Sequence, residues 1–243
     1  MTYCVGLRLE QGLVFMSDTR INAGVDNFAT SKKMFTCTVP GERMITIMTA
    51  GNLATTQAMI SLLEERSKAL EERDPSILHA QTMFQVARLV GATLKEVIAD
   101  STGNGQDAAD QFDASVIVGG QIKSGKPTIF LIYPQGNFIE ITSDTPFFQI
   151  GEIKYGKPIL VRAYDPKMSF DETVKLLLVS FGSTVKSNLS VAPPFDLQVY
   201  DAGSFDGSRT TRIEENDPVY QTISDGWGDA LKAAFQKLPS YPL

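Results

Sequence analysis

The sequence predicts an α+β fold of four layers, αββα, in which two antiparallel sheets lie between layers of helices. Segments typical of strands, joined by short turns, open the chain; helical segments follow, and strands and then helices return. Turns of hairpin length favour antiparallel pairing, and each sheet must bury an apolar face against another layer. With 243 residues the chain is long enough for one domain, 1–243, with a C-terminal helical extension from about residue 200.

Two strands are predicted at the start, over residues 3–9 and 13–18, with a short turn at 10–12. Apolar residues alternate along the first of them, as in a strand with one buried face. Antiparallel partners are equidistant from the turn that joins them. Thr2 is therefore expected opposite Asp18 or one of the two residues that follow it.

A second hairpin is predicted over residues 33–39 and 44–50, which flank a turn that contains Pro and Gly. The same construction places Lys33 opposite Ala50 and Gly51. We expect the two hairpins to lie side by side in one sheet, which would bring their ends to a common edge.

That edge would hold Thr2, Asp18, Lys33 and Gly51. Met1 before a small residue is usually removed, and Thr2 would then carry both a hydroxyl nucleophile and a free α-amino group. The ordinary pKa of such an amine is about 7.7 to 8.0, so it can accept the hydroxyl proton near neutral pH. Lys33 would lower the proton affinity of the hydroxyl and the amine, while Asp18 would orient Lys33. The alternative interpretation of this acid and lysine is a surface ion pair.

Gly51 is followed by Asn52 and a stretch with helical apolar spacing, so it lies at an expected helix start. N–H groups at a helix N-terminus can stabilise the oxyanion that forms when a nucleophile attacks a carbonyl. A simple strand-to-helix turn is the alternative. Together the four residues predict an N-terminal nucleophile site.

Four segments resemble the catalytic signature of proteasome β subunits and of the related bacterial two-tier protease. They are Thr2 after a one-residue leader, 17–20 (SDTR), 33–35 (KMF) and 49–52 (TAGN). The opening run and the length are similar to Anbu, the bacterial ancestral β-subunit branch. The resemblance implies a proteasome β-subunit-like αββα sandwich of the N-terminal nucleophile (Ntn) hydrolase superfamily.

The resemblance also implies roles. It matches Thr2 to the family's nucleophile, Asp18 to its aspartate, Lys33 to its lysine and Gly51 to its oxyanion glycine. The Gly-Ser-Gly segment of typical β subunits corresponds to residues 149–152 (QIGE). Because this segment differs and a second acid of the family is missing, the catalytic hydrogen-bond network is expected to be weaker than in those subunits.

Further positions follow from the same resemblance. Arg20 is a supporting residue, and Ile21 and Thr49 are placed near a modest, uncharged pocket for the substrate's side chain. Ser187 and Ser190 occupy the region where typical β subunits carry Asp-x-x-Ser. They are expected to hydrogen-bond the terminal amine or, alternatively, to satisfy backbone groups at a helix end.

The rest of the chain supplies the other layers. A capping-box pattern starts at Ser169, and the last predicted helix has an apolar residue at every fourth position, for core packing or for a subunit contact. The predicted helices are 53–68, 76–99, 173–185 and 219–237, and the predicted strands between them are 112–118, 128–133 and 138–142.

Composition favours a soluble cytoplasmic enzyme. A net charge of −6 gives no electrostatic case for nucleic acid or anionic membranes, and we find neither a membrane-spanning stretch nor a secretion signal. Cys4 and Cys37 are expected to be free thiols in strands. The single His79 is placed on the second predicted helix, where a structural or exposed role is expected. Neither a phosphate loop nor metal-ligand spacing is present, so we expect no cofactor and no metal.

The leading hypothesis is a threonine peptidase that cleaves a peptide or unfolded-protein substrate through an acyl-threonine ester. No long leader precedes Thr2, so an aminopeptidase is expected to expose it. The resemblance implies a homo-oligomer, a ring or an open helical ring, and an ATPase partner is left open. One alternative is an Ntn amidase that acts on a small amide or modified peptide. The other is a weakly active or inactive self-assembling scaffold.

Overall fold

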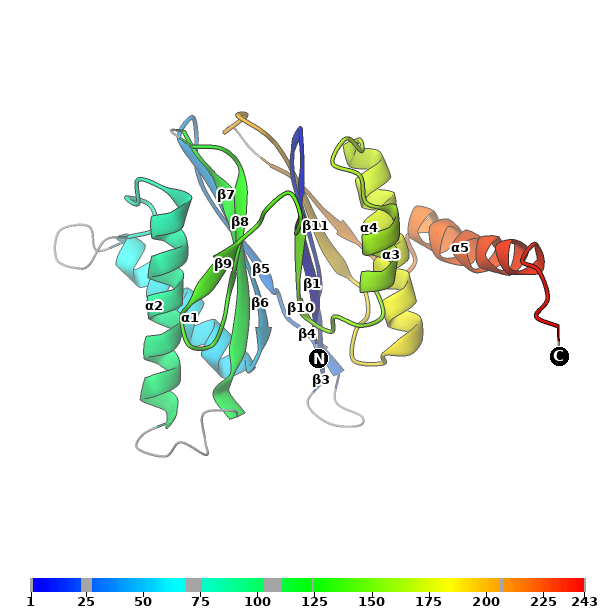
Figure 1. Ribbon diagram of the computed structural model, residues 1–243. Coiled ribbons are helices and arrows are strands. Elements are labelled where there is room, and N and C mark those ends of the chain that lie inside the picture. Colours follow the sequence, from blue (N-terminus) through cyan, green and yellow to red (C-terminus); the bar gives the residue numbers. More distant parts are fainter. Residues whose placement is uncertain are drawn as a thin grey trace.

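Four layers stack across the molecule, with two sheets inside and helices on both outer faces (Figure 1). The structure is a computed structural model, and it describes residues 2–22, 28–68, 76–102, 111–123, 125–205 and 208–242. This arrangement confirms the predicted αββα fold with two antiparallel sheets.

Each main sheet has five antiparallel strands. The first sheet contains, in spatial order, β10 (Phe147–Gly151), β1 (Tyr3–Leu9), β2 (Gly12–Asp18), β11 (Phe195–Asp201) and β12 (Arg209–Ile213). The second sheet contains β5 (Met34–Val39), β6 (Arg43–Gly51), β7 (Ala114–Ile122), β8 (Thr128–Ile132) and β9 (Phe138–Glu140). A two-stranded ribbon of β3 (Arg20–Asn22) and β4 (Phe28–Thr30) lies on the connection between the two sheets.

Helices cover the outer faces of both sheets (Figure 1). The second sheet is covered by α1 (Leu53–Lys68) and α2 (Met83–Thr102), and the first sheet by α3 (Lys157–Ala163) and α4 (Phe170–Ser187). The last helix, α5 (Pro218–Gln236), starts beside α4 and projects away from the sandwich.

Three apolar clusters separate the layers. Leu94 belongs to the cluster between the second sheet and its helices, Phe15 and Met48 to the cluster between the sheets, and Phe181 to the cluster between the first sheet and its helices. All four side chains are fully buried. The sheets are therefore held face to face by apolar packing, which contributes roughly 25 cal/mol for each Å² removed from water.

The first hairpin has the predicted register, with Cys4 opposite Ser17. In the second hairpin Met34 lies opposite Met48, so Lys33 faces Thr49 rather than the next two residues as expected. The Thr49 N–H donates to the Lys33 carbonyl over 3.0 Å, which fixes this pairing.

The expectation that the two hairpins share one sheet is wrong. The strands β1 and β2 pair with β10 and β11, while β6 pairs with β7 in the other sheet. All of β2 and nearly all of β1 are buried, so the first hairpin is covered on both faces. Such a hairpin is central in its sheet, and its inner face packs on the second hairpin through Phe15 and Met48. The strand ends still converge, because the chain crosses from one sheet to the other at that end.

The second long helix begins at Met83 and not near residue 76. Between Ser76 and Ala80 the chain forms a turn instead, and Arg43 donates hydrogen bonds of 2.9 Å to the carbonyls of Ile77 and Ala80. Carbonyls that accept from a buried guanidinium need no helical partner. His79 consequently lies in this turn and not on a helix, and it is exposed.

The sequence prediction misses β3 and β4, which lie in the connection expected to be a loop, and also β10, β11, β12 and α3. Six of the seven residues of β11 are buried, so the strand lacks the alternation that reveals a half-exposed strand. The other five elements are three to seven residues long, which gives little periodic signal. In contrast, α4 begins with the predicted capping box, in which Ser169 accepts from the Glu172 N–H.

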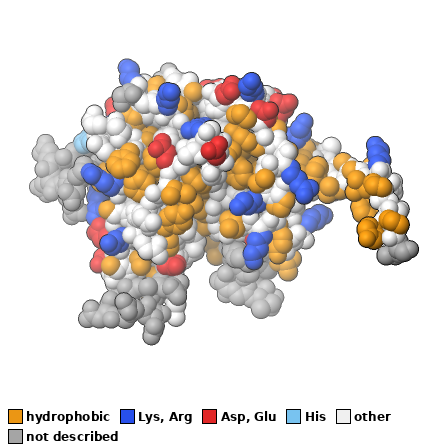
Figure 2. Space-filling view, viewed as in Figure 1, with side chains coloured by type: hydrophobic (Ala, Val, Ile, Leu, Met, Phe, Trp, Pro, Cys, Tyr) orange, Lys and Arg blue, Asp and Glu red, His pale blue; other side chains and the backbone are white. Residues whose placement is uncertain are grey.

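The C-terminal helix leaves most of its apolar residues in solvent. Tyr220 is its one buried residue, and Ile223 packs against the core beside α4. Farther along, Leu231 and Phe235 are 50% and 76% exposed, and Figure 2 shows apolar side chains along this projecting arm. Among the described residues, no helix is both long and apolar enough to cross a membrane.

Candidate active site

A pocket of about 320 Å³ opens where the ends of β1, β3 and β6 meet. It contains the predicted nucleophile, the predicted lysine and the predicted oxyanion glycine. The residues that line it are Thr2, Arg20, Ile21, Lys32, Lys33, Phe35, Thr49, Ala50, Gly51, Leu53, Thr56, Gln57 and Gly151.

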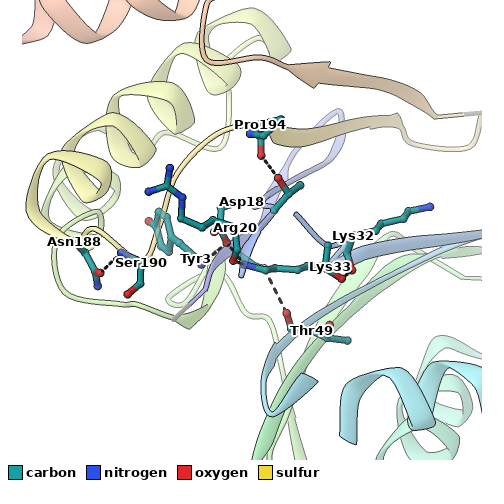
Figure 3. A network of polar contacts seen from close by, with 12 residues as sticks. Tyr3, Asp18, Arg20, Lys32, Lys33, Thr49, Asn188, Ser190 and Pro194 are labelled. Atoms are coloured by element: carbon teal, nitrogen blue, oxygen red, sulfur yellow. Dashed lines mark hydrogen bonds and ion pairs between the residues drawn. The ribbon is translucent and has the colours of Figure 1, made fainter. Parts of the chain in front are cut away.

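A buried ion pair lies beside this pocket. The Lys33 Nζ is 2.8 Å from Oδ1 of Asp18 and donates a second hydrogen bond of 2.7 Å to the Arg20 carbonyl (Figure 3). The same Asp18 oxygen accepts from the Tyr3 N–H over 2.9 Å. Burial raises the pKa of the Asp18 carboxyl, while Lys33 and the backbone donors act in the opposite direction. The surface ion pair considered from sequence is excluded, since Asp18 is 0% and Lys33 6% exposed.

Thr2 is held by the strand next to it. Its carbonyl accepts from the Glu152 N–H over 2.6 Å, one residue beyond the pair of Tyr3 and Gly151 that ends the β1–β10 ladder. Gly151 has a φ of +81°, and a Cβ there would overlap the Thr2 carbonyl oxygen. A glycine is therefore required for the close approach of these two backbones.

Gly51 is the last residue of β6, and only Asn52 separates it from the start of α1. Its φ is +114°, and an added Cβ would overlap the carbonyl oxygen of Asp113 on the neighbouring segment. Asn52 caps the helix, because its Oδ1 accepts from the Thr55 N–H over 3.1 Å. The pocket thus meets the positive end of the α1 dipole at the predicted glycine.

The supporting residues lie around the α4–β11 connection. Arg20 donates to the Leu189 carbonyl over 3.0 Å, and the Ser190 N–H donates to Oδ1 of Asn188 over 2.9 Å (Figure 3). Ser187 is exposed at the last residue of α4, and Ser190 is half-buried. Neither serine lines the pocket, and their binding of a freed Thr2 amine stays a prediction.

The expected side-chain pocket residues, Ile21 and Thr49, both line the cavity. However, Lys32 and Arg20 line it as well, so the pocket carries more positive charge than the uncharged pocket that the resemblance suggested. Lys32 lies 5.6 Å from the centre of the Phe35 ring.

Sequence reasoning assigned no role to Glu152 or Asn188. Glu152 is 6% exposed, and its Oε2 accepts from Nδ2 of Asn188 over 3.0 Å. An acid that directly follows a glycine at the end of a strand is the signal that could have pointed to this position. Its neighbours in space could not be found, because β10 pairs with β1 across more than a hundred residues.

The chemistry available at the site is that of side chains and backbone. Within the ranges that the structure describes, His, Cys, Asp and Glu form no group of three that could hold a metal ion. The site combines a hydroxyl, a buried ammonium and a helix N-terminus around one cavity. These are the components of nucleophilic attack on a carbonyl.

Comparison with known proteins finds relatives over the whole length of the chain. The family model described as proteasome subunit matches residues 2–192. Among solved structures, Anbu (ancestral beta-subunit) from Yersinia bercovieri is 43% identical with a TM-score of 0.91, and Anbu from Hyphomicrobium sp. strain MC1 is 47% identical with a TM-score of 0.91. Both matches cover 100% of each chain.

A further similar structure is a helical assembly of the Anbu complex from Pseudomonas aeruginosa. It is 44% identical with a TM-score of 0.91, and the match covers 99% of this chain and 98% of the other. The comparison with curated proteins gave no match. A family match over most of the chain, together with full-length relatives above 40% identity, shows that the chain belongs to the proteasome subunit family, in its Anbu branch.

Proposed function

We propose that the chain is an N-terminal threonine hydrolase of proteasome type, which cleaves peptide bonds after Met1 has been removed from Thr2. One observation carries the proposal: Thr2, Lys33 and Gly51 line the same cavity, with Asp18 buried behind the lysine. These residues lie on four separate segments, so their convergence is a property of the fold and not of one local motif.

The first half of the reaction forms an ester. The Thr2 hydroxyl oxygen attacks the carbonyl carbon of the substrate, and its proton moves to the α-amino group of the same residue. The oxyanion that forms accepts a hydrogen bond from the backbone at Gly51, where the α1 dipole also favours negative charge. The carbon–nitrogen bond then breaks, and the amine returns the proton to the leaving nitrogen.

Water completes the cycle. The α-amino group takes a proton from water, the hydroxide attacks the acyl-threonine ester, and the acid product leaves as the Thr2 hydroxyl is restored. The Lys33 ammonium favours loss of the hydroxyl proton through its positive charge. Asp18 and the Arg20 carbonyl hold that ammonium in place from the far side.

A fluorogenic peptide panel tests this activity. The chain with Met1 removed is expected to release the fluorophore, Thr2→Ser to retain part of the rate, and Thr2→Ala to have none. Neutral and acidic residues before the cleaved bond are expected to be accepted better than basic ones, because Lys32 and Arg20 line the pocket. Turnover of small amides without peptide cleavage would favour the amidase alternative.

Self-assembly is the second part of the proposal. The similar Anbu complex from Pseudomonas aeruginosa is described as a helical assembly. In this chain α5 projects from the sandwich with Leu231 and Phe235 exposed, as expected for a helix that contacts a neighbouring copy (Figure 1). We therefore propose a homo-oligomer, a ring or an open helical ring.

A scaffold with little or no activity is the remaining candidate, and the exposed apolar arm on α5 is the observation that favours it. The two candidates differ in one respect that can be measured. A scaffold assembles normally when Thr2 is replaced by Ala and shows no hydrolysis before or after that change. The hydrolase loses its activity with the same substitution and keeps its assembly.

A further inference from the structure

Glu152 is a buried carboxylate that accepts hydrogen bonds from neutral donors. Its Oε1 accepts from the Lys154 N–H over 2.8 Å, and its Oε2 from Nδ2 of Asn188 over 3.0 Å. Its side chain and backbone together are 6% exposed. The other buried acids differ: Asp18 pairs with Lys33, and Asp196 with Arg212.

The ion pairs that the structure gives for the described part of the chain do not include Glu152. A buried carboxylate is unfavourable unless a cation compensates its charge, because burial removes the solvation that stabilises the ionised form. The place where Glu152 lies is therefore suited to a positive charge, which the ion pairs of the described residues do not supply.

The strand pairing identifies where that charge arises. Glu152 lies opposite Thr2 and donates its own N–H to the Thr2 carbonyl over 2.6 Å. Residues directly opposite one another in an antiparallel pair have Cβ atoms about 5 Å apart, within reach of a glutamate side chain. Removal of Met1 turns the Thr2 nitrogen from a neutral amide into an amine, whose ordinary pKa is about 7.7 to 8.0.

We propose that the Glu152 carboxylate, oriented by Asn188, is the counter-ion of the α-ammonium group that Met1 removal creates on Thr2. The inference rests on the proposed function only in that Thr2 becomes the N-terminal residue. Glu152 acts as a positioning residue: it holds the amine that exchanges the proton with the Thr2 hydroxyl. It also stabilises the protonated amine, so the amine releases its proton at a higher pH.

Several charged groups line the pocket together with Thr2 or lie beside it, and their effects on the pKa of the amine oppose one another. Lys33, Lys32 and Arg20 on the pocket side favour the neutral amine, while Asp18 on β2 offsets Lys33. On the first sheet, the buried Tyr3 phenol stays neutral because burial raises its pKa. The Glu152 carboxylate is thus the group that stabilises the protonated form of the amine.

Periodate oxidation of the processed chain tests the proposal without any peptide substrate. Periodate converts an N-terminal threonine to a glyoxylyl group, and the reaction requires the neutral amine beside the hydroxyl. The pH midpoint of its rate, read from the mass of the intact chain, therefore reports the pKa of the Thr2 amine. Hydrolysis of peptides does not enter this measurement.

Glu152→Gln is expected to lower that midpoint by about one to two pH units, which makes oxidation about 10- to 100-fold faster at pH 6. Glu152→Asp keeps the negative charge but moves it away from the amine by the length of one methylene group. Its midpoint is expected to lie between those of the unsubstituted chain and of Glu152→Gln. Glu10→Gln, which removes an exposed acid on the turn after β1, is the matched control and is expected to leave the midpoint unchanged.

The outcomes separate this inference from the proposed function. An unchanged midpoint in both Glu152 variants overturns the inference, even when peptide hydrolysis is normal. A lowered midpoint in a chain that hydrolyses no peptide supports the inference and contradicts the proposed function. A chain that retains Met1 cannot be oxidised at Thr2, and that result overturns both. If Glu152→Gln does not fold, the midpoint of Glu152→Asp decides.

Discussion

The Lys33 ammonium lies 2.8 Å from Oδ1 of Asp18, and both side chains are buried at the end of the cavity that contains Thr2. The Arg20 carbonyl accepts a second hydrogen bond from Lys33, and the Tyr3 N–H donates to the same Asp18 oxygen. The Lys33 side chain is therefore held in place by a residue of the first sheet. Lys33 itself directly precedes β5, a strand of the second sheet.

Replacing this lysine should damage both stability and activity. Lys33→Ala leaves the Asp18 carboxylate buried without its cation, which typically costs about 3 to 5 kcal/mol. Thermal unfolding should show that loss, and kcat/KM for peptide hydrolysis should fall by at least about 100-fold. Lys126→Ala, which removes an exposed lysine outside the cavity, is the matched control. Normal hydrolysis by a folded Lys33→Ala chain would contradict the assigned role.

Gly51→Ala should destabilise the chain and abolish hydrolysis. A φ of +114° costs a residue with a side chain roughly 1 to 3 kcal/mol, and the added Cβ also overlaps the Asp113 carbonyl oxygen. Gly41→Ala is the control, since Gly41 has a φ of +71° with no atom within 4 Å of the new Cβ. Gly41→Ala should lose only the unfolding free energy that the positive φ costs, and it should keep its hydrolytic activity. Equal unfolding free energies for the two variants would contradict the overlap.

The thiols should be poor nucleophiles at pH 8. Burial raises the pKa of both Cys4 and Cys37, so at this pH the thiolate fraction of each is smaller than that of an exposed cysteine. For Cys37, whose side chain is only half-buried, reactivity should rise as the pH is raised through the shifted pKa. Alkylation followed by peptide mass spectrometry should show slow modification of the half-buried Cys37 and none of Cys4 until the chain is unfolded. Modification of Cys4 in the folded chain at the rate of Cys37 would contradict its burial.

Assembly should depend on the exposed part of α5. The double variant Leu231→Glu, Phe235→Glu is expected to form smaller species in light scattering, while its unfolding free energy changes by less than about 0.5 kcal/mol because both side chains are exposed. Gln236→Glu adds a negative charge to the same helix and is expected to assemble normally. An unchanged assembly in the double variant would remove α5 from the interface.

Local signals predict much of the site correctly. The position of a turn determines the register of its hairpin, so the turn at residues 10–12 is enough to predict that Thr2 and Asp18 lie near each other. Asn52 and Ser169 have short-range capping partners, and both cap the predicted helices. The hydrophobic periodicity of residues 53–68 likewise predicts the helix that the structure describes there.

These local signals do not predict which strands pair when the strands are far apart in the sequence. A strand buried on both faces carries no alternation that names its neighbour, so the two hairpins are predicted in one sheet although they lie in two. For the same reason Glu152 has no role in the sequence prediction, because its place opposite Thr2 depends on the pairing of β10 with β1. The proximity of Thr2 and Asp18 follows from one hairpin and can be predicted locally. The proximity of Thr2 and Glu152 depends on strands that are far apart in the sequence.

The most direct test of the account is the reaction of the purified chain with a peptide epoxyketone, followed by the mass of the intact chain and of its N-terminal peptide. This electrophile needs both the hydroxyl and the free amine of an N-terminal threonine. The proposed mechanism predicts a chain without Met1 that carries one adduct on Thr2, and no adduct in Thr2→Ala. A chain that has lost Met1, is folded and still fails to react would contradict the hydrolase and leave the scaffold.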